Sequence, residues 1–253
     1  MKAVVSDSLK PLVVFIGLIL FWQGLVSALS MPSYILPSPV GVMTSMYDNA
    51  SLLWDNTLIT LAEMLMGLVL GVVFGVGLAL LLVFFAPLRP WLLPPLLITQ
   101  AIPVFALAPI LMLWFGYGLA SKVVMTILVI FFPVATCCYD GLRHTHQHWL
   151  DMAQTMGGKP FAVLRHIRWP AALPALASGL RVAVVVAPIG AVVGEWVGSS
   201  AGLGYMMMQA NARLLVDQMF AALAVLAFCS VSLYYLTDRG LRWLIPWQTE
   251  TSN

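Results

Sequence analysis

Long runs of apolar residues alternate with short polar segments along the whole chain. The runs cover residues 11–29, 58–85, 91–115, 120–139, 171–194 and 219–237. An α-helix needs about 20 apolar residues to cross the roughly 30 Å hydrocarbon core of a bilayer, and each run is close to or above that length. We therefore predict an all-α integral membrane protein with about six membrane-spanning helices, in which residues 1–253 form a single transmembrane domain.

Prolines set the third apolar run apart from the others. The run contains Pro94, Pro95, Pro103 and Pro109. Each proline lacks a backbone N–H donor and disfavours a straight helix. Unpaired backbone groups at membrane depth are tolerated only where protein or water surrounds them. The sequence thus predicts a kinked or broken helix in this run, buried among its neighbours.

The composition agrees with a membrane location. Hydrophobic residues make up 61% of the chain and charged residues 9%, which is too little charge for the surface of a water-soluble domain. The net charge is only +2 and no basic patch is present, so nucleic-acid binding is not expected. The three cysteines lie inside apolar runs without a CxxC or CxxH spacing, which predicts buried free thiols: Cys137, Cys138 and Cys229.

The basic residues predict which side of the membrane each loop faces. An even number of spans places both termini on one side, and nine basic residues fall there: Lys2, Lys10, Arg89, Arg143, Lys159, Arg165, Arg168, Arg239 and Arg242. Only Lys122 and Arg213 fall opposite, and Arg181 lies within a span. Because cytoplasmic loops carry the excess of basic residues, we expect both termini and the 140–170 loop in the cytoplasm and the 30–57 segment outside.

Glycine recurs at every fourth position in the second and the fifth apolar runs. The positions are Gly67, Gly71 and Gly75, and then Gly190, Gly194 and Gly198. Glycine at this spacing opens a groove on one helix face, so that another backbone can approach closely. The pattern favours tight helix contacts along these two runs, although glycine is also common in membrane helices for no such reason.

The 140–169 segment is too polar to cross the membrane, yet its residues follow a helical pattern. Apolar residues at i, i+3, i+4 and i+7 line one face of a short helix: Trp149, Met152, Ala153 and Met156. Gly157 and Gly158 then end this helix, because glycine adopts left-handed conformations without a steric penalty. Pro160 suits the first turn of a second short helix, which we expect to reach Ile167.

A short helix, a glycine turn and a second helix make a compact projection between two spans. Such a projection suits a groove on a partner protein. The pattern is equally typical of a helix that lies in the membrane interface, with its apolar stripe in lipid. Periodicity alone leaves both uses open.

The same segment resembles the EAA loop of binding-protein-dependent transport permeases. That motif is written E-A-A, three residues, G, nine residues, I-x-L-P. The matching residues here are Asp151-Met152-Ala153, Gly157 and Ile167-Arg168-Trp169-Pro170. The spacing agrees at every step. Three residues differ from the motif: Asp151 replaces glutamate, Met152 replaces the first alanine and Trp169 replaces leucine. An acidic residue, a small residue and the glycine nevertheless stand at the positions that the motif requires.

The resemblance extends over most of the chain. It is carried by the segments 36–39, 102–103, 108–109, 113–116, 121–122 and 202–205, and it is similar to the nitrate, taurine and aliphatic-sulfonate branch of these permeases. The run from Gly194 to Tyr205, followed by 209–213, looks most like the subset that imports pyrimidine precursors of thiamine. The resemblance therefore implies a small polar solute: such a pyrimidine, or otherwise a sulfonate, taurine or nitrate-type compound.

The resemblance also implies partners and roles. In the family the loop is a coupling helix that inserts into a cleft of an ATPase, so the expected ATPase-coupling residues are Trp149, Asp151, Met152, Ala153, Gly157, Ile167 and Pro170. The fold it implies is that of a type I ABC importer permease, with the coupling helix between the fourth and fifth spans. Two permease copies would pair in the bacterial cytoplasmic membrane, bind two ATPase subunits and receive solute from an external, periplasmic binding protein.

Four polar residues inside the spans are candidates for the translocation path: Glu63, Gln100, Arg181 and Glu195. An ionisable group in a membrane span is costly and usually faces the bundle or a water-filled path. A carboxylate at headgroup level is the alternative for Glu63 and Glu195, and Arg181 could extend to the interface or pair within the bundle. These carboxylates also leave an ion-coupled secondary transporter open as a second function.

No enzyme chemistry is expected in this chain. No GxxxxGK[ST] sequence occurs, so ATP is expected on the partner subunit and no cofactor on this one. There is no nucleophile elbow and no thiol beside a histidine, so we expect no catalytic residue. His144, His146 and His148 alternate without a cysteine or an HExxH partner, which favours a polar turn over a metal site.

Overall fold

The computed structural model describes the backbone of residues 2–247, with all side chains in that range except those of residues 2–12, Phe15 and Gln100. Its elements are α1 Lys2–Ala28, α2 Pro39–Asp48, α3 Ala50–Phe84, the 3-10 turn η1 Ala86–Leu88, α4 Arg89–Ala101, α5 Val104–Phe115, α6 Leu119–Arg143, α7 Gln147–Thr155, α8 Pro160–Val163, the π-helical turn η2 Leu164–Arg168, α9 Trp169–Gly198, α10 Leu203–Ala212 and α11 Val216–Leu244. No strand occurs in residues 2–247. The all-α prediction is confirmed.

Each apolar run coincides with a helix. Four helices are long and apolar enough to cross a membrane: α3, α6, the continuous helix over 160–198, and α11. The bent pair α4 and α5 would make a fifth span. The first run corresponds to α1, whose described apolar part is Ile16–Ala28. Several observed helices extend well beyond the predicted runs: α3 begins eight residues before the run at 58, and α11 ends seven residues after the run that closes at 237.

The break predicted from the prolines is present. The two halves, α4 and α5, meet at an angle of 102°. Ile102 between them has an extended conformation (φ −83°, ψ 123°), as expected for a residue before proline. The expected burial is wrong for most of this segment. α5 packs on α6 and α9 through Ala108 and Leu111, but the break and much of α4 are exposed on the single chain.

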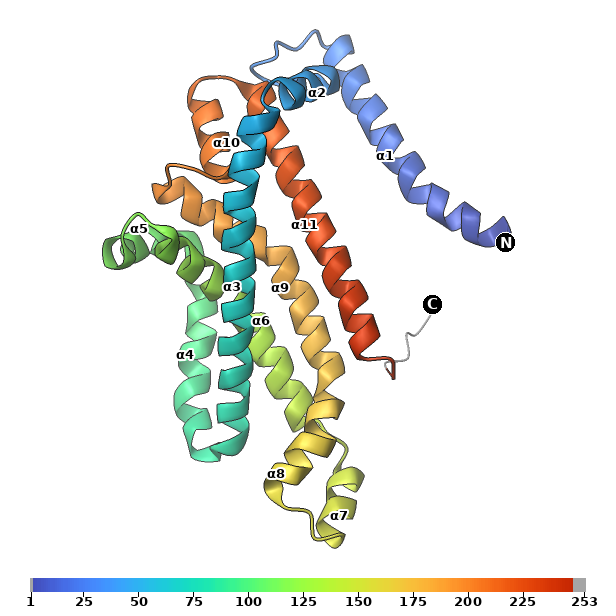
Figure 1. The fold of residues 1–253 in the computed structure, drawn as a ribbon, viewed down its shortest axis with the longest axis vertical. Helices are drawn as coiled ribbons and strands as arrows, with labels where there is room; N and C mark the ends of the chain where they lie inside the picture. Colours follow the sequence, from blue (N-terminus) through green and yellow to red (C-terminus); the bar gives the residue numbers. More distant parts are fainter. Residues whose placement is uncertain (1, 248–253) are drawn as a thin grey trace.

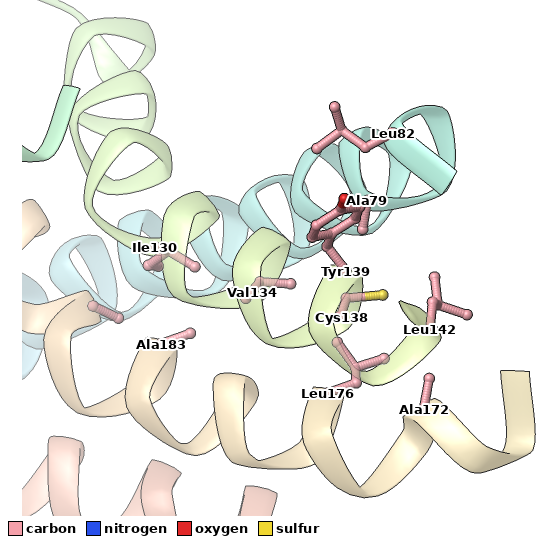
Figure 2. Close-up of a cluster of buried hydrophobic side chains, with 11 residues drawn as sticks. Ala79, Leu82, Ile130, Val134, Cys138, Tyr139, Leu142, Ala172, Leu176 and Ala183 are labelled. Carbon is pink, nitrogen blue, oxygen red and sulfur yellow. The ribbon is translucent and has the colours of Figure 1, made fainter. Parts of the chain in front are cut away.

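The centre of the bundle is α6, packed between α3 and α9 (Figure 2). Near one end, Ile130, Val134 and Cys138 of α6 are buried against both neighbours. Cys138 is a buried free thiol as predicted, whereas Cys137 and Cys229 are free but only partly buried. This three-helix core is the rigid part on which the polar sites described below are built.

The glycine stripes explain how α6 fits so closely between its neighbours. A β-carbon on Gly67 of α3 would collide with Thr126, and one on Gly190 of α9 would lie 2.7 Å from the Cα atom of the same Thr126. Gly194 is similarly close to Lys122, with its added β-carbon 3.1 Å from the Lys122 Cα atom. The predicted tight contacts are confirmed, except that Gly198 faces the end of α5 instead.

The bundle has two distinct ends (Figure 1). At one end, which we call the α7 end, α7 and α8 project beyond the ends of α3 and α4. At the other, the α10 end, the short helices α2 and α10 lie beside the upper ends of α3 and α11. The sites predicted from the sequence fall at these two ends.

The second short helix predicted over 160–167 does not exist as a separate element. The helix begins at Pro160, as expected, but it continues through the π-helical turn η2 into α9. The Trp169 N–H donates to the Leu164 carbonyl, five residues earlier. Pro170 has no N–H to offer to the preceding turn, and a locally wider turn accommodates its ring without ending the helix. The projection is therefore one short helix beside the extended start of a span.

Candidate functional site

The helix α7 carries the apolar side chains that the sequence placed on one face. Trp149 and Met152 of α7 and Met156 directly after it are 47%, 58% and 79% exposed. Ala153 turns inward and is buried, so the small residue of the motif faces the chain itself. Asp151 lies on the surface, where its Oδ1 atom accepts a hydrogen bond from the Gln147 side chain at 2.8 Å. Exposed tryptophan and methionine on a projecting helix are typical of a protein-binding surface.

Gly157 ends α7 in the conformation that the sequence predicted. Its φ of +72° lies in the left-handed region. The Gly157 N–H donates to the Gln154 carbonyl and the Gly158 N–H to the Ala153 carbonyl, which together form a Schellman motif. A β-carbon on Gly157 would meet no atom within 4 Å, whereas one on Gly158 would lie 2.7 Å from the Ala153 oxygen. Gly157 is thus required for its backbone angle, and its side-chain position faces open space.

Four of the predicted coupling residues line one hollow of about 670 Å³: Trp149, Met152, Ile167 and Pro170. His146 also lines it, and its ring packs edge-on against Trp149 with centroids 5.2 Å apart. We call this the aromatic hollow. Asp151 and Gly157 do not line it. The structure thus brings the two ends of the motif, 149–152 and 167–170, together across the glycine turn.

A buried polar network lies at the α10 end, and it contains both candidate carboxylates. Glu63 of α3 and Glu195 of α9 are each 0% exposed. Lys122 Nζ forms an ion pair with Glu63 Oε1 at 2.8 Å and donates to Ser199 Oγ at 2.6 Å. The second oxygen of Glu63, Oε2, is buried without a hydrogen-bond partner. Two acids and one base are thus held together in an apolar setting, where each charge depends on its partners.

Glu195 holds the beginning of α10 in place. Its Oε1 atom accepts from the Thr60 hydroxyl at 2.6 Å, and its Oε2 atom accepts from the backbone N–H groups of Gly204 and Tyr205. These N–H groups lie in the first turn of α10, where a helix has no internal partner for them. A β-carbon on Gly202 would collide with the same carboxylate, which explains why glycine stands there at a φ of +113°.

Arg181 lies apart from this network. Arg181 of α9 forms an ion pair with Asp238 of α11 at 2.7 Å, and Asp238 also binds Arg242 at 2.8 Å. Of the two predictions for Arg181, pairing within the bundle is the one confirmed. The Gln100 side chain lies outside the described residues, so its role stays a prediction.

Four members of the polar network were not among the candidate site residues predicted from the sequence: Asn56, Thr60, Lys122 and Ser199. Asn56 Oδ1 accepts from the Gly202 N–H at 2.7 Å, and Thr60 Oγ1 accepts from the Leu203 N–H at 2.8 Å. A signal was present, because Asn56, Thr60 and Glu63 form a polar stripe at i, i+4 and i+7 of an apolar helix. Lys122 was counted among the basic residues on the outer side of the membrane. Its partner Glu63 lies 59 positions away, so no pattern of neighbouring residues predicts the ion pair.

Comparison with known proteins identifies the family. Residues 71–250 match the family described as "Binding-protein-dependent transport system inner membrane component". The match covers more than half of the chain, and the chain belongs to this family. It is accordingly the permease subunit of an ABC importer, a multi-pass membrane protein that works with an ATPase and a binding protein. The family decides against the ion-coupled secondary transporter.

Individual relatives agree with this assignment. A "Probable ABC transporter permease protein" of Haemophilus influenzae is 56% identical, with 94% of this chain and 95% of that protein covered. The formylaminopyrimidine transport permease protein ThiX of Halalkalibacterium halodurans is 35% identical over 96% of this chain and 97% of that protein. Among solved structures, a permease chain of the inward-facing MetNI methionine ABC transporter is 21% identical with a TM-score of 0.63, covering 79% of this chain and 97% of that one. That likeness supports the type I importer fold.

Proposed function

We propose that α7 is the element through which this permease receives the conformational change of its ATPase. The proposal rests on the geometry of the projecting segment. Gly157 in a left-handed conformation fixes the end of α7, and Trp149, Met152 and Met156 are exposed on the same projection. The coupling set is the one that the EAA-like motif implies, namely Trp149, Asp151, Met152, Ala153, Gly157, Ile167 and Pro170. The test is ATPase association with variants of Gly157, which is argued in the Discussion.

We further propose that two copies of this chain enclose the path and that two ATPase subunits bind them. The broken helix supports this arrangement. Ile102 and Pro103 interrupt the helical hydrogen bonds and are exposed on the single chain. Because lipid cannot satisfy free backbone groups, this break requires another protein surface or a water-filled path beside it. A second copy of the chain packed against α4 and α5 would provide the protein surface and would enclose the water-filled path. Glu63, Gln100, Arg181 and Glu195 remain the candidates for groups along or near this path.

The proposed orientation places the α7 end and both termini in the cytoplasm of a bacterium, with the α10 end outside. The two basic residues assigned to the outside differ in exposure, because Lys122 is buried in its ion pair with Glu63 and only Arg213 is exposed. Of the two bases counted at the α10 end, only Arg213 is thus an exposed charge, and this shortage of exposed bases supports the orientation.

Cysteine labelling tests the orientation. In a background with the three native cysteines replaced, a cysteine at the exposed position Ser51 is expected to react with an impermeant maleimide in intact spheroplasts. A cysteine at Gln248 is expected to react only after the membrane is opened. Labelling of the Gln248 position in intact spheroplasts would contradict the proposed topology.

The proposed substrate is a pyrimidine precursor of thiamine, with a sulfonate, taurine or nitrate-type solute as the second candidate. The similarity to ThiX over nearly the full length of both chains supports the pyrimidine. In reconstituted vesicles with the cognate ATPase and binding protein, we expect ATP-dependent uptake of formylaminopyrimidine that excess taurine or nitrate does not reduce. The purified binding protein is expected to show the same preference. Binding of a sulfonate and not of the pyrimidine would reverse the order of the two candidates.

A further inference from the structure

A second hollow lies on the other face of α7. It has a volume of about 480 Å³ and is bordered by the end of α3, by α7 and by the start of the helix at Pro160. At 100° per residue, the α7 residues that line it, Gln147, Leu150 and Gln154, point away from Trp149 and Met152, which line the aromatic hollow. We call it the Arg168 hollow, after the charged residue in its wall.

Arg168 is without a partner in this hollow. Its Nε atom is buried and has no hydrogen-bond partner, and no described residue forms an ion pair with its guanidinium. The described residues of the wall include no aspartate or glutamate. The nearby Asp151 carboxylate is engaged with Gln147, which leaves Gln154 as the free amide of the wall. A buried polar atom of this kind calls for a partner, and a guanidinium binds carboxylate and phosphate oxygens best.

We propose that Arg168 binds a carboxylate side chain of the ATPase, which enters this hollow when the ATPase covers α7. The inference rests on the proposed coupling role of α7. A partner that receives α7 in a cleft covers both faces of this helix, so it also closes the mouth of the hollow and removes water from Arg168. An unpaired guanidinium would then be costly, so a partner that binds well must supply an anion at this position.

A lipid phosphate offers the same chemistry, but the position of the hollow favours the ATPase. Two of its walls, α7 and the Gly158 turn, belong to the part of the chain that projects beyond the ends of α3 and α4 (Figure 1). The hollow also shares α7 with the exposed apolar side chains that a protein partner would cover. The ATPase is therefore the occupant to which the proposal commits, and the lipid is an outcome of the test.

The test uses the complete permease in nanodiscs, titrated with its cognate ATPase. Arg168→Gln is expected to raise the Kd about tenfold, the change typical of losing a charged contact at an interface, and to flatten the dependence of Kd on salt. The effect should be the same in phosphatidylcholine alone and in discs that contain phosphatidylglycerol. Arg165→Gln is the matched control, because Arg165 is exposed on the same turn and does not line the hollow. It should change the Kd less than twofold.

Each other outcome overturns the proposal. An Arg168→Gln variant that binds as tightly as the wild type shows that no carboxylate enters the hollow. A defect seen only with phosphatidylglycerol assigns the site to a lipid headgroup. Arg168→Lys keeps a charge in place and should recover at least half of the lost affinity, so a lysine variant as weak as the glutamine variant indicates a packing defect. If the wild-type permease itself does not bind the ATPase in either disc, the result contradicts the proposed coupling role of α7, on which the role of Arg168 depends.

Discussion

Replacing Gly157 with aspartate is expected to reduce binding-protein-stimulated ATP hydrolysis and solute uptake about tenfold or more. At a φ of +72°, a β-carbon costs about 1 kcal/mol. An added β-carbon meets no atom of the chain within 4 Å, so the carboxylate that it carries is directed into the space where we propose that the ATPase binds. A negative charge at the C-terminal end of α7 also opposes the helix dipole. Burying it without a partner at the interface accounts for most of the expected loss.

Two further substitutions separate the causes. Gly157→Ala adds the backbone strain with little bulk, and about 1 kcal/mol corresponds to a roughly fivefold weaker association. Gly157→Asn has the size of aspartate, tolerates left-handed angles better than alanine and carries no charge, so it should bind better than the aspartate variant. The measurement is co-purification of the ATPase and its stimulated turnover in vesicles at matched permease content. Normal association and uptake by the aspartate variant would show that the loop over 147–168 is not the coupling element.

The membrane helices could be predicted from the sequence because their cause is local. A span requires a sufficient apolar length, and the runs supplied it, although α3 begins eight residues before its run and α11 ends seven residues after its run. The break before Pro103 was predictable for the same reason, since proline restricts its own backbone and that of the preceding residue. Its exposure on the single chain was not predictable, because what covers a helix depends on residues distant in the sequence.

The loop at the α7 end was predicted correctly where its structure depends on neighbouring residues, and wrongly where it depends on packing. The position of Gly157 and the helix start at Pro160 followed from turn and capping preferences. The sequence also predicted that the second helix is short and reaches only Ile167. The π-helical turn Leu164–Arg168 instead accommodates the first proline and joins the two helices into one. Proline lowers the stability of a helix interior, but packing of α9 on α6 over its whole length outweighs that cost.

The polar network at the α10 end was predictable only in part. The positions of Glu63 and Glu195 near the ends of apolar spans left burial and a headgroup-level site both open, and the structure shows both side chains buried. Their partners come from three helices and from the 199–205 segment, so the sequence distances between bonded residues range from 9 to 135 positions. Charge counting placed Lys122 among the basic residues on the outer side of the membrane. A charge near the end of a span faces either solvent or a partner, and only the packed structure decides between them.

Replacing Lys122 with methionine is expected to destabilise the folded permease by about 3–5 kcal/mol. The substitution preserves most of the side-chain length but removes the only base that is paired with Glu63 among the described residues. The Glu63 carboxylate, already without a partner for Oε2, would then be buried with neither oxygen bound. Ser199 would lose its bond from Lys122 as well, which loosens the segment that leads into α10. For a chain of this size, the midpoint of thermal unfolding should fall by about 10 °C.

The double variant Lys122→Met with Glu63→Met distinguishes a lost ion pair from a disturbed core. Removing both charges leaves apolar side chains of similar volume, and such exchanges of a buried pair are often neutral or stabilising. We therefore expect the double variant to recover most of the stability that the single variant loses. Arg213→Met, an exposed base at the same end of the bundle, should change stability by less than about 0.5 kcal/mol. A double variant as unstable as Lys122→Met would mean that the lysine stabilises the α10 end through packing and Ser199, and that its charge contributes little.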